Sequence, residues 1–321
     1  PDASAHGVDQ ALTNDEPQTG ALILSLRGRV HLGKGLKKQM LLILRDTEPG
    51  VAHAYLQILM VGAVQAMENR GMSVPDAEIL VEQGLQALEA NDLAGLQVAH
   101  MRLQSAIAAA EPNRESPYWR YRRYESFAEL REELRLPAVD RYSEASGAYE
   151  ARLYGGWLAQ IVAGALGTAL EGYNTDALRN AFGEIRDFVV PPSTFNDDVT
   201  FELAFLKALE RTGSEIAALD IAEEWVGLIP FGWSAELVAL RNLRQGILPP
   251  ESATFQNPFY EWVGAQMRGA VCGLVAPGQP ERAAELAWID ASVSHAYNGT
   301  LGEIFNALLV SFGFVMDNAR E

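Results

Sequence analysis

The stretch GGWLAQIVAGALGTALEG, residues 155–172, combines small apolar residues with closely spaced glycines and reaches Glu171 just before its last glycine. A glycine in a helix interior costs roughly 0.5 to 1 kcal/mol relative to alanine, so this pattern indicates a helix that packs closely against its neighbours. Outward from this stretch, apolar residues recur every three or four positions over most of the chain, and strand-like alternation is scarce. The sequence therefore predicts an all-α fold.

Shifts in composition divide the chain into three predicted segments. Residues 1–20 lack apolar periodicity, and we expect a lead-in without regular structure. Residues 21–140 are predicted to form an N-terminal helical module that serves packing or docking. Its helices are expected over 22–45, 52–69, 75–90 and 91–110, with a turn at 48–50. Residues 141–321 are predicted to form the second domain.

Charge and cysteine content limit the possible partners and the cellular compartment. The formal net charge of −17 repels nucleic-acid phosphates and anionic membrane surfaces, so neither is an expected partner. Arginines at 120, 122 and 123 lie among aromatic residues, and solvated helix faces are the favoured interpretation of this run over an anion site. Cys272 is the sole cysteine, which excludes an intrachain disulfide and fits a reducing compartment. We therefore expect a cytoplasmic protein, and residues 301–316 are too short an apolar run to span a bilayer.

Two acidic segments are candidates for chemistry. Glu171 closes the glycine-rich stretch, where it is either a surface glutamate at a helix end or a carboxylate held in a cleft. Asp197 and Asp198 follow two prolines at a predicted helix start, where the helix dipole favours ionised carboxylates. One carboxylate suffices for capping, whereas two of them flanked by Asn196 and Thr200 offer the oxygen ligands that Mg²⁺ requires. Capping and metal binding both stay open on this evidence.

Polar residues cluster again in two later segments. Between 255 and 269, Asn257, Gln266 and Arg268 stand among aromatic residues near glycines, a composition that suits a loop orienting a polar ligand. Arg268 either faces a phosphate or forms a salt bridge. Between 290 and 303, His295 is either structural or a proton carrier near neutral pH. The other candidates in this segment are Tyr297, Asn298, Gly299 and Glu303.

Taken in order, these segments resemble the ADP-ribosylglycohydrolase family over about residues 150–316. The resemblance rests on five elements that occur in sequence. They are the glycine-rich helix ending on Glu171, Asn-Asp-Asp-Val-Thr at 196–200, Gly-Ala-Gln-Met-Arg-Gly at 264–269, the Ala-Pro-Gly-Gln-Pro run at 276–287 and Ser-His-Ala-Tyr-Asn-Gly at 294–299.

The resemblance implies a multi-helix orthogonal bundle that hydrolyses an ADP-ribosyl or related ribosyl N- or O-glycosidic bond. It implies two divalent ions, Mg²⁺ or Mn²⁺, held by an acidic site that maps onto Glu171, Asn196, Asp197, Asp198 and Thr200. Glu171 and Asp198 are the implied catalytic groups. The implied substrate contacts are Asn257, Gln266, Arg268, His295, Tyr297, Asn298, Gly299 and Glu303. Expected partners are an ADP-ribosylated protein or a ribosyl-containing small molecule, with self-association or a protein partner through the N-terminal helices.

The sequence departs from the family pattern at two points. Where the family has Thr-Asp-Asp-Thr, this sequence has Asn196 in the first place and Val199 in the fourth. The family's second acidic motif contains Asp-x-Asp, and no such segment occurs in this sequence. Three explanations account for the missing Asp-x-Asp motif: the sequence is a fragment, another polypeptide completes the site, or the domain does not catalyse a reaction. Three functions therefore stay open: the ribosyl hydrolase, a nucleoside-type N-glycosidase on the same scaffold, and an inactive binding or structural protein.

Overall fold

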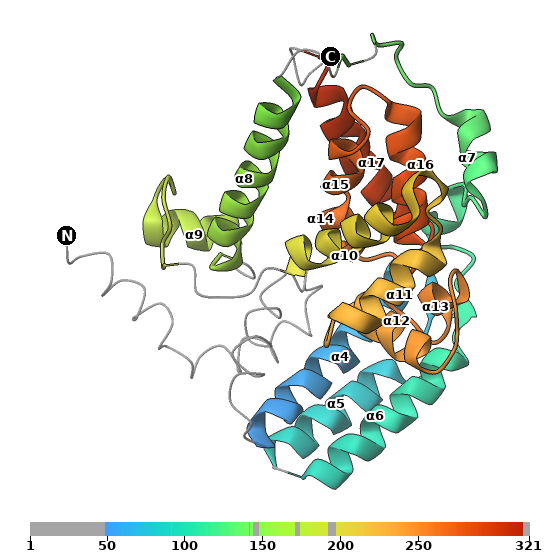
Figure 1. Ribbon diagram of the computed structural model, residues 1–321. Coiled ribbons are helices and arrows are strands. Elements are labelled where there is room, and N and C mark those ends of the chain that lie inside the picture. Colours follow the sequence, from blue (N-terminus) through green and yellow to red (C-terminus); the bar gives the residue numbers. More distant parts are fainter. Residues whose placement is uncertain are drawn as a thin grey trace. The chain divides into compact units, whose positions relative to one another are not determined.

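The computed structural model describes residues 49–90, 92–140, 142–143, 148–170, 174–191 and 197–316, and helices dominate all the longer ranges (Figure 1). Within these ranges, extended structure is limited to strands β1, Met72–Ser73, and β2, Glu111–Pro112, which pair antiparallel. The predicted all-α class is confirmed. The lead-in at 1–20 and the helix expected over 22–45 lie outside the described residues.

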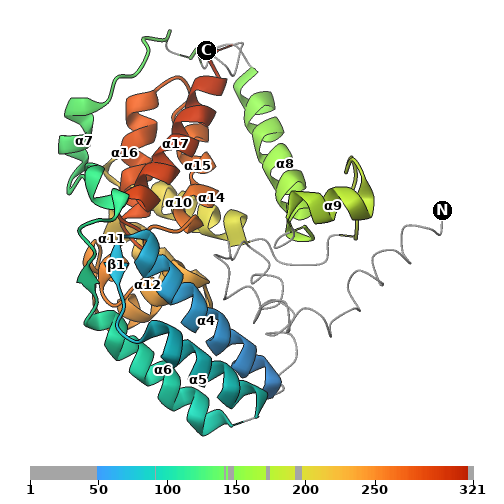
Figure 2. The same cartoon turned by 180° about the vertical axis from the view of Figure 1, so that it is seen from behind.

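Three helices form the N-terminal part of the described chain. They are α4, Pro49–Asn69; α5, Ala77–Glu89; and α6, Leu93–Ala108. Helices α5 and α6 pack side by side in both views (Figures 1 and 2), and the Asp92 side chain caps α6 by accepting a hydrogen bond from the Gly95 N–H at 2.9 Å. The turn predicted at 48–50 was wrong at its last two positions, because Pro49 and Gly50 belong to the first turn of α4. Proline is well tolerated there, since its missing N–H has no partner within a helix.

A short irregular stretch follows these helices. It contains the 3₁₀ helix η1, Pro117–Arg120, and helix α7, Phe127–Glu133, which is capped by the Ser126 side chain. The β1–β2 pair connects the end of α4 to the segment before η1, with Met72 opposite Pro112. This pairing brings residues 113–120 next to the end of α4, where Trp119 donates from Nε1 to the Gly71 carbonyl at 3.1 Å.

The glycine-rich stretch forms helix α8, Ala148–Thr168, as predicted, but its glycines are not uniformly in close contact. An added Cβ at Gly156 would lie 3.0 Å from Leu274 Cδ2. At Gly155 and Gly167 it would meet nothing within 4 Å in the described part of the chain. The expectation of close packing was therefore wrong at these two positions.

The remaining helices follow α8 in the chain, and those from α10 onward surround the main core. They are α9, Thr175–Phe182; α10, Asp197–Thr212; η3, Gly213–Glu215; α11, Ala218–Leu228; α12, Ser234–Arg244; α13, Glu251–Thr254; α14, Gly264–Arg268; α15, Ala270–Leu274; α16, Pro280–Ala291; and α17, Asn298–Gly313. Except for α9, these elements pack on one another, with α17 against α14, α15 and α16 (Figure 1). Fully buried Phe201, Phe205 and Trp225 lie in this core with alanines that allow close helix approach.

Two glycines set the distance between α17 and the short helices α14 and α15. A Cβ at Gly269 would lie 2.7 Å from the backbone oxygen of Glu303, and one at Gly273 would lie 2.6 Å from Val310 Cβ. Since these distances are far below van der Waals contact, only glycine permits the observed packing. Helix α14 and the buried face of α17 are thereby held together, and residues 264–268 are helical where the sequence suggested a loop.

The chain divides into two compact units. One comprises Pro1–Ile58 and Leu158–Asn196, and the other comprises Leu59–Trp157 and Asp197–Glu321. In the second unit, Ala63 and Ala66 of α4 pack against Ala235 and Phe259, so the N-terminal helices and the C-terminal helices share buried surface. The boundary predicted near residue 140 stays a prediction. None of the helices within the described residues is long and apolar enough to cross a membrane.

Candidate active site

The paired aspartates begin helix α10. Asp197 and Asp198 occupy its first turn and are half-buried, as is Thr200 one turn further on. A helix start carries unpaired backbone N–H groups and the positive end of the helix dipole, which stabilise ionised carboxylates. Glu171 and Asn196, the other two residues of the predicted metal site, lie outside the described residues. The shared site of these five residues therefore stays a prediction.

The donor set at the start of α10 has the right chemistry for a hard cation. Two carboxylates and one hydroxyl supply oxygen atoms, which Mg²⁺ and Mn²⁺ prefer. Among the residues that the structure describes, no group of three His, Cys, Asp or Glu side chains is arranged to hold a metal ion. The residues at this helix start thus form part of a possible ligand set, and the remainder is predicted from 171 and 196.

One turn further along, α10 enters a buried cluster of charged residues centred on Arg268. The Arg268 side chain is 1% exposed. Its Nε donates to Asp290 Oδ2 at 2.5 Å, and its Nη1 donates to Glu236 Oε1 at 3.2 Å. Its Nη1 also donates to the Gly264 carbonyl at 3.1 Å, and Nη2 donates to Ser294 Oγ at 3.0 Å. Arg268 thus connects α12, α14 and α16 through its planar fork of donors.

Aromatic rings complete the surroundings of this arginine. The guanidinium carbon lies 4.8 Å from the centre of the Trp225 ring and 5.6 Å from that of Phe201. Burial by itself lowers the pKa of Arg268, but Asp290, Glu303 and Glu236 raise it, and the net shift is upward. Arg268 is therefore a permanent cation. Of the two interpretations left open by the sequence, the structure shows the salt bridge, and a phosphate contact by Arg268 stays a prediction.

Glu303 of α17 is fully buried beside this cluster. Its Oε2 lies 3.8 Å from Arg268 Nη2. Burial raises the pKa of Glu303 well above its ordinary value, and the neighbouring Asp290 carboxylate raises it further, while Arg268 lowers it. Burial and Asp290 thus both favour the neutral, protonated form of the Glu303 carboxyl. In that form Glu303 donates a hydrogen bond to Asp290, which stays paired with Arg268.

His295 is fully buried at the other end of the same network. Its Nδ1 lies 2.8 Å from Ser294 Oγ, and its Nε2 lies 4.0 Å from Glu236 Oε1. Burial lowers the pKa of His295 well below its ordinary value, and the Arg268 charge lowers it further, so the imidazole is neutral. Ser294 accepts from Arg268, and donation to Nδ1 from the same hydroxyl places the ring proton on Nε2, which has no hydrogen-bond partner among the described residues. In this position His295 holds the loop, and a substrate contact stays a prediction.

Two more predicted site residues belong to the same rigid framework. The buried Asn257 amide donates to the backbone oxygens of Ala253 at 2.8 Å and Ala235 at 3.2 Å. Gly299 is buried where a Cβ would approach the Tyr260 carbonyl and lie 2.9 Å from His295 Cδ2. Asn257 and Gly299 therefore hold the local backbone in position and are not themselves accessible to a ligand.

The remaining predicted contacts are accessible. Gln266 and Asn298 are exposed, and Tyr297 is half-buried. Tyr297 has a positive φ of 50°, a conformation that few residues other than glycine adopt, directly before Asn298 begins α17. Asn298 hydrogen-bonds to the Glu261 carboxylate through its backbone and its side chain. Gln266, Tyr297 and Asn298 are thus the predicted contacts that a ligand at this surface can reach.

Residues outside the predicted set complete the network. Glu202 accepts a hydrogen bond from the Val271 N–H at 3.3 Å, and Glu236 contacts Arg268, both with fully buried side chains. Tyr118 donates to Glu261 at 2.5 Å from a position 143 residues earlier in the chain. One signal was available for Glu202, because it follows Asp198 by four residues and shares its helix face. Nothing in the sequence indicates that Tyr118, Glu236 and Glu261 take part in these contacts.

Cys272 has the properties expected from its apolar surroundings. It is fully buried, and burial raises the pKa of its thiol well above the ordinary value. Its Sγ lies 3.9 Å from Glu303 Oε1. A buried thiol that stays protonated is a weak nucleophile, so Cys272 acts as a small core residue.

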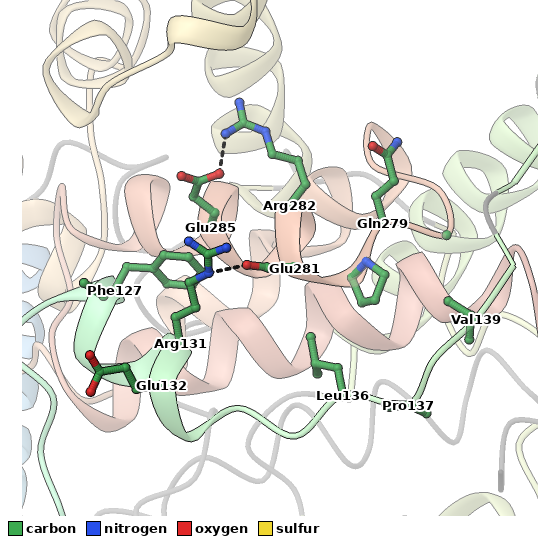
Figure 3. A pocket seen from close by; sticks show the side chains of 13 residues that line it. Phe127, Arg131, Glu132, Leu136, Pro137, Val139, Gln279, Glu281, Arg282 and Glu285 are labelled. Carbon is green, nitrogen blue, oxygen red and sulfur yellow. Dashed lines mark hydrogen bonds and ion pairs between the residues drawn. The ribbon is translucent and has the colours of Figure 1, made fainter.

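A separate groove lies between α7 with its following segment and the start of α16 (Figure 3). Its volume is about 1100 Å³. Figure 3 shows two ion pairs among its side chains, Arg131 with Glu281 and Arg282 with Glu285 at 2.6 Å, and no interaction of Glu132 with the other residues drawn. Because both arginines are paired in this way, the groove offers no free cation or carboxylate pair for chemistry.

One of three comparisons with known proteins found a match. The family model described as ADP-ribosylglycohydrolase matches residues 145–319, which is more than half of the chain. These residues therefore form an all-α domain of the glycohydrolase class. The chain belongs to the ADP-ribosylglycohydrolase family. A search of curated proteins found no match, and a search of solved structures found none either.

Proposed function

We propose that the protein is a metal-dependent hydrolase that cleaves an ADP-ribosyl, or related ribosyl, N- or O-glycosidic bond. The observation that carries the proposal is the pair Asp197 and Asp198, half-buried at the start of α10 in a domain of this family. Cleavage at an anomeric carbon requires an oriented sugar and an activated water, and adjacent carboxylates at a helix start serve both needs.

In this proposal Asp197, Asp198 and Thr200, together with Glu171 and Asn196, hold two Mg²⁺ or Mn²⁺ ions. When bound, such ions orient the ribose hydroxyls and lower the pKa of a bound water. Glu171 or Asp198 accepts the proton of the attacking water as general base.

Substrate recognition falls to the accessible side chains beside the buried network. Gln266, Tyr297 and Asn298 line the exposed part of this surface, and their amide and hydroxyl groups suit the hydroxyls of a ribose. Through its contacts with the Gly264 carbonyl and Ser294 Oγ, Arg268 holds helix α14 and the loop 294–297 in fixed positions. Preorganisation of this kind preserves the positions of binding groups at the reacting bond.

The test compares three aspartate variants on an ADP-ribosylated peptide. We expect the wild type to release ADP-ribose only with Mg²⁺ or Mn²⁺ present. Asp197→Asn and Asp198→Asn should each reduce turnover by about 100-fold or more, because a lost ligand affects metal binding at least as strongly as a lost outer-shell partner. Asp176→Asn is the matched control, since Asp176 also lies in the first turn of a helix, α9, but is exposed.

Circular dichroism of each variant checks that the fold is retained. Full activity in both Asp197→Asn and Asp198→Asn would reject the site. A parallel panel of free nucleosides separates ribosyl-protein hydrolysis from nucleoside N-glycosidase activity. Calorimetric titration with Mg²⁺ separates both enzymes from a binding protein that has lost the metal.

A further inference from the structure

A line of alternating cations and aromatic rings joins the N-terminal helices to the loop that precedes α17. We call it the cation–aromatic ladder, and in spatial order its members are Arg70, Tyr260, Tyr297, Arg123, Trp119 and Arg114. Arg70 lies over the Tyr260 ring at 4.1 Å, and Tyr260 meets Tyr297 edge to face at 5.8 Å. All of these residues belong to one compact unit.

Arg123 is the central member of the ladder. Its guanidinium carbon lies 5.0 Å from the centre of the Tyr297 ring and 5.2 Å from that of Trp119. Arg114 lies 5.4 Å from the Trp119 ring as well. Stacking on an aromatic face restricts a guanidinium without using the N–H donors in its plane. Arg123 is thus held in place while its donors remain available.

Most arginines of residues 114–123 lack a carboxylate partner among the described residues; the exception is Arg122, which pairs with Glu133. Arg114, Arg120 and Arg123 are all exposed, and none forms an ion pair within the described residues. This is unusual in a chain with 42 acidic and 25 basic side chains, where a cation readily meets a carboxylate. Glu125, two residues after Arg123, accepts a hydrogen bond from the Tyr297 hydroxyl at 3.2 Å. Three cations without partners within ten residues indicate a surface that receives an anion from outside the chain.

The position of the ladder relates this anion to the proposed substrate. Tyr297, which stacks on Arg123, directly precedes Asn298, one of the accessible contacts beside the buried network. Tyr121 of the same segment exposes 71% of its surface and offers an aromatic face to a base. A ligand that carries a ribose, a diphosphate and a base matches these groups in chemical type. Nucleic acid fits less well, because the net charge of −17 repels a long polyanion.

We propose that Arg123, with Arg114 and Arg120, binds the diphosphate of the ADP-ribosyl ligand. The inference rests on the proposed function, and it assigns diphosphate recognition to residues 114–123, which precede the segment matched by the family model. Planar guanidinium groups bind phosphate oxygens through paired N–H donors, so a stacked arginine is well suited to this task.

The test is calorimetric titration of the full chain with ADP-ribose, ADP, inorganic diphosphate and adenosine. We expect Arg123→Gln to weaken ADP-ribose and ADP by about ten-fold each, the effect of losing one charge-assisted contact. Adenosine, which has no phosphate, should bind both proteins equally. Arg123→Lys keeps the positive charge but loses the planar guanidinium. Its affinity for ADP should therefore lie between those of the wild type and Arg123→Gln.

Arg102→Gln is the matched control. Arg102 is an exposed arginine of α6 outside the ladder, and its loss changes the net charge by the same amount. Equal affinities of wild type and Arg123→Gln for ADP and ADP-ribose would overturn the inference, as would an equal loss in Arg102→Gln. Tighter binding of single-stranded RNA than of ADP-ribose would also overturn it. An Arg123-dependent affinity for ADP without any hydrolysis would support the inference and reject the proposed function, so the two failures are distinguishable.

Discussion

Replacement of Arg268 by methionine tests whether the buried network is held together by one cation. The side chain is 1% exposed and contacts Asp290 at 2.5 Å and Glu236 at 3.2 Å. Without the guanidinium, both carboxylates lose the charge of Arg268 while they remain buried. Breaking a buried pair in this way costs about 3–5 kcal/mol, because the cost is that of an uncompensated buried charge. We therefore expect Arg268→Met to lower the free energy of unfolding by this amount.

Arg211 provides an exposed control that has three carboxylate partners of its own. It contacts Asp220, Glu223 and Glu224 at 3.3, 3.1 and 3.2 Å. Its side chain is 44% exposed, so water and salt screen these pairs and they contribute little to stability. Arg211→Met should leave the stability close to that of the wild type.

The measurement is urea unfolding followed by circular dichroism at pH 7. For Arg268→Met, we expect the midpoint to fall by more than about 1 M, given the usual dependence of stability on urea. At pH 5 the deficit should be smaller, because the buried carboxylates that lost their cation take up protons more readily. Equal midpoints for Arg268→Met and Arg211→Met would refute the reasoning. So would a deficit in Arg268→Met that grows as the pH falls.

Two further predictions concern α17 and its neighbours. Because the pKa of Glu303 is raised by burial, its contribution to stability is complete below the ordinary value of 4.5 and is lost as the pH rises through the raised value. Glu303→Gln, which carries no titrating proton, should therefore reduce the fall in unfolding free energy between pH 5 and pH 8 by up to about 1.4 kcal/mol per pH unit. Urea unfolding at several pH values measures this fall. If the unfolding free energy of Glu303→Gln falls between pH 5 and pH 8 as steeply as that of the wild type, the prediction is contradicted. Gly273→Ala should destabilise by about 1–3 kcal/mol through overpacking against Val310. Gly155→Ala, with open space in the described chain around it, should stabilise by roughly 0.5–1 kcal/mol, and thermal unfolding of both variants decides the point.

Local sequence patterns predicted the helices well, because helix formation depends on neighbours three and four residues apart. The starts of α10 at Asp197 and of α6 after Asp92 follow from capping chemistry that a short stretch contains. At Pro49 the same reasoning was wrong, since a proline that breaks a helix in its interior is also well suited to begin one.

The contacts of the candidate site depend on residues far apart in the chain. Glu236 and Arg268 are separated by 32 positions, and nothing in either neighbourhood shows that the glutamate is buried. For the same reason, the sequence left open whether Arg268 forms a salt bridge or faces a phosphate. Capping explains Asp197 and Asp198 as readily as metal binding does, so their predicted role depends on the family resemblance and on the proposed experiment.

The cation–aromatic ladder also affects how sequences of related proteins should vary. Arg123 lies between a ring of the N-terminal segment and a ring of the family domain, so neither ring is independent of the other. In a relative with an aliphatic residue in place of Trp119, Arg123 would stack on one ring only. Different side chains would then be tolerated at the position of Tyr297. The two positions should therefore covary among relatives that retain both segments, although only one of them lies within the family domain.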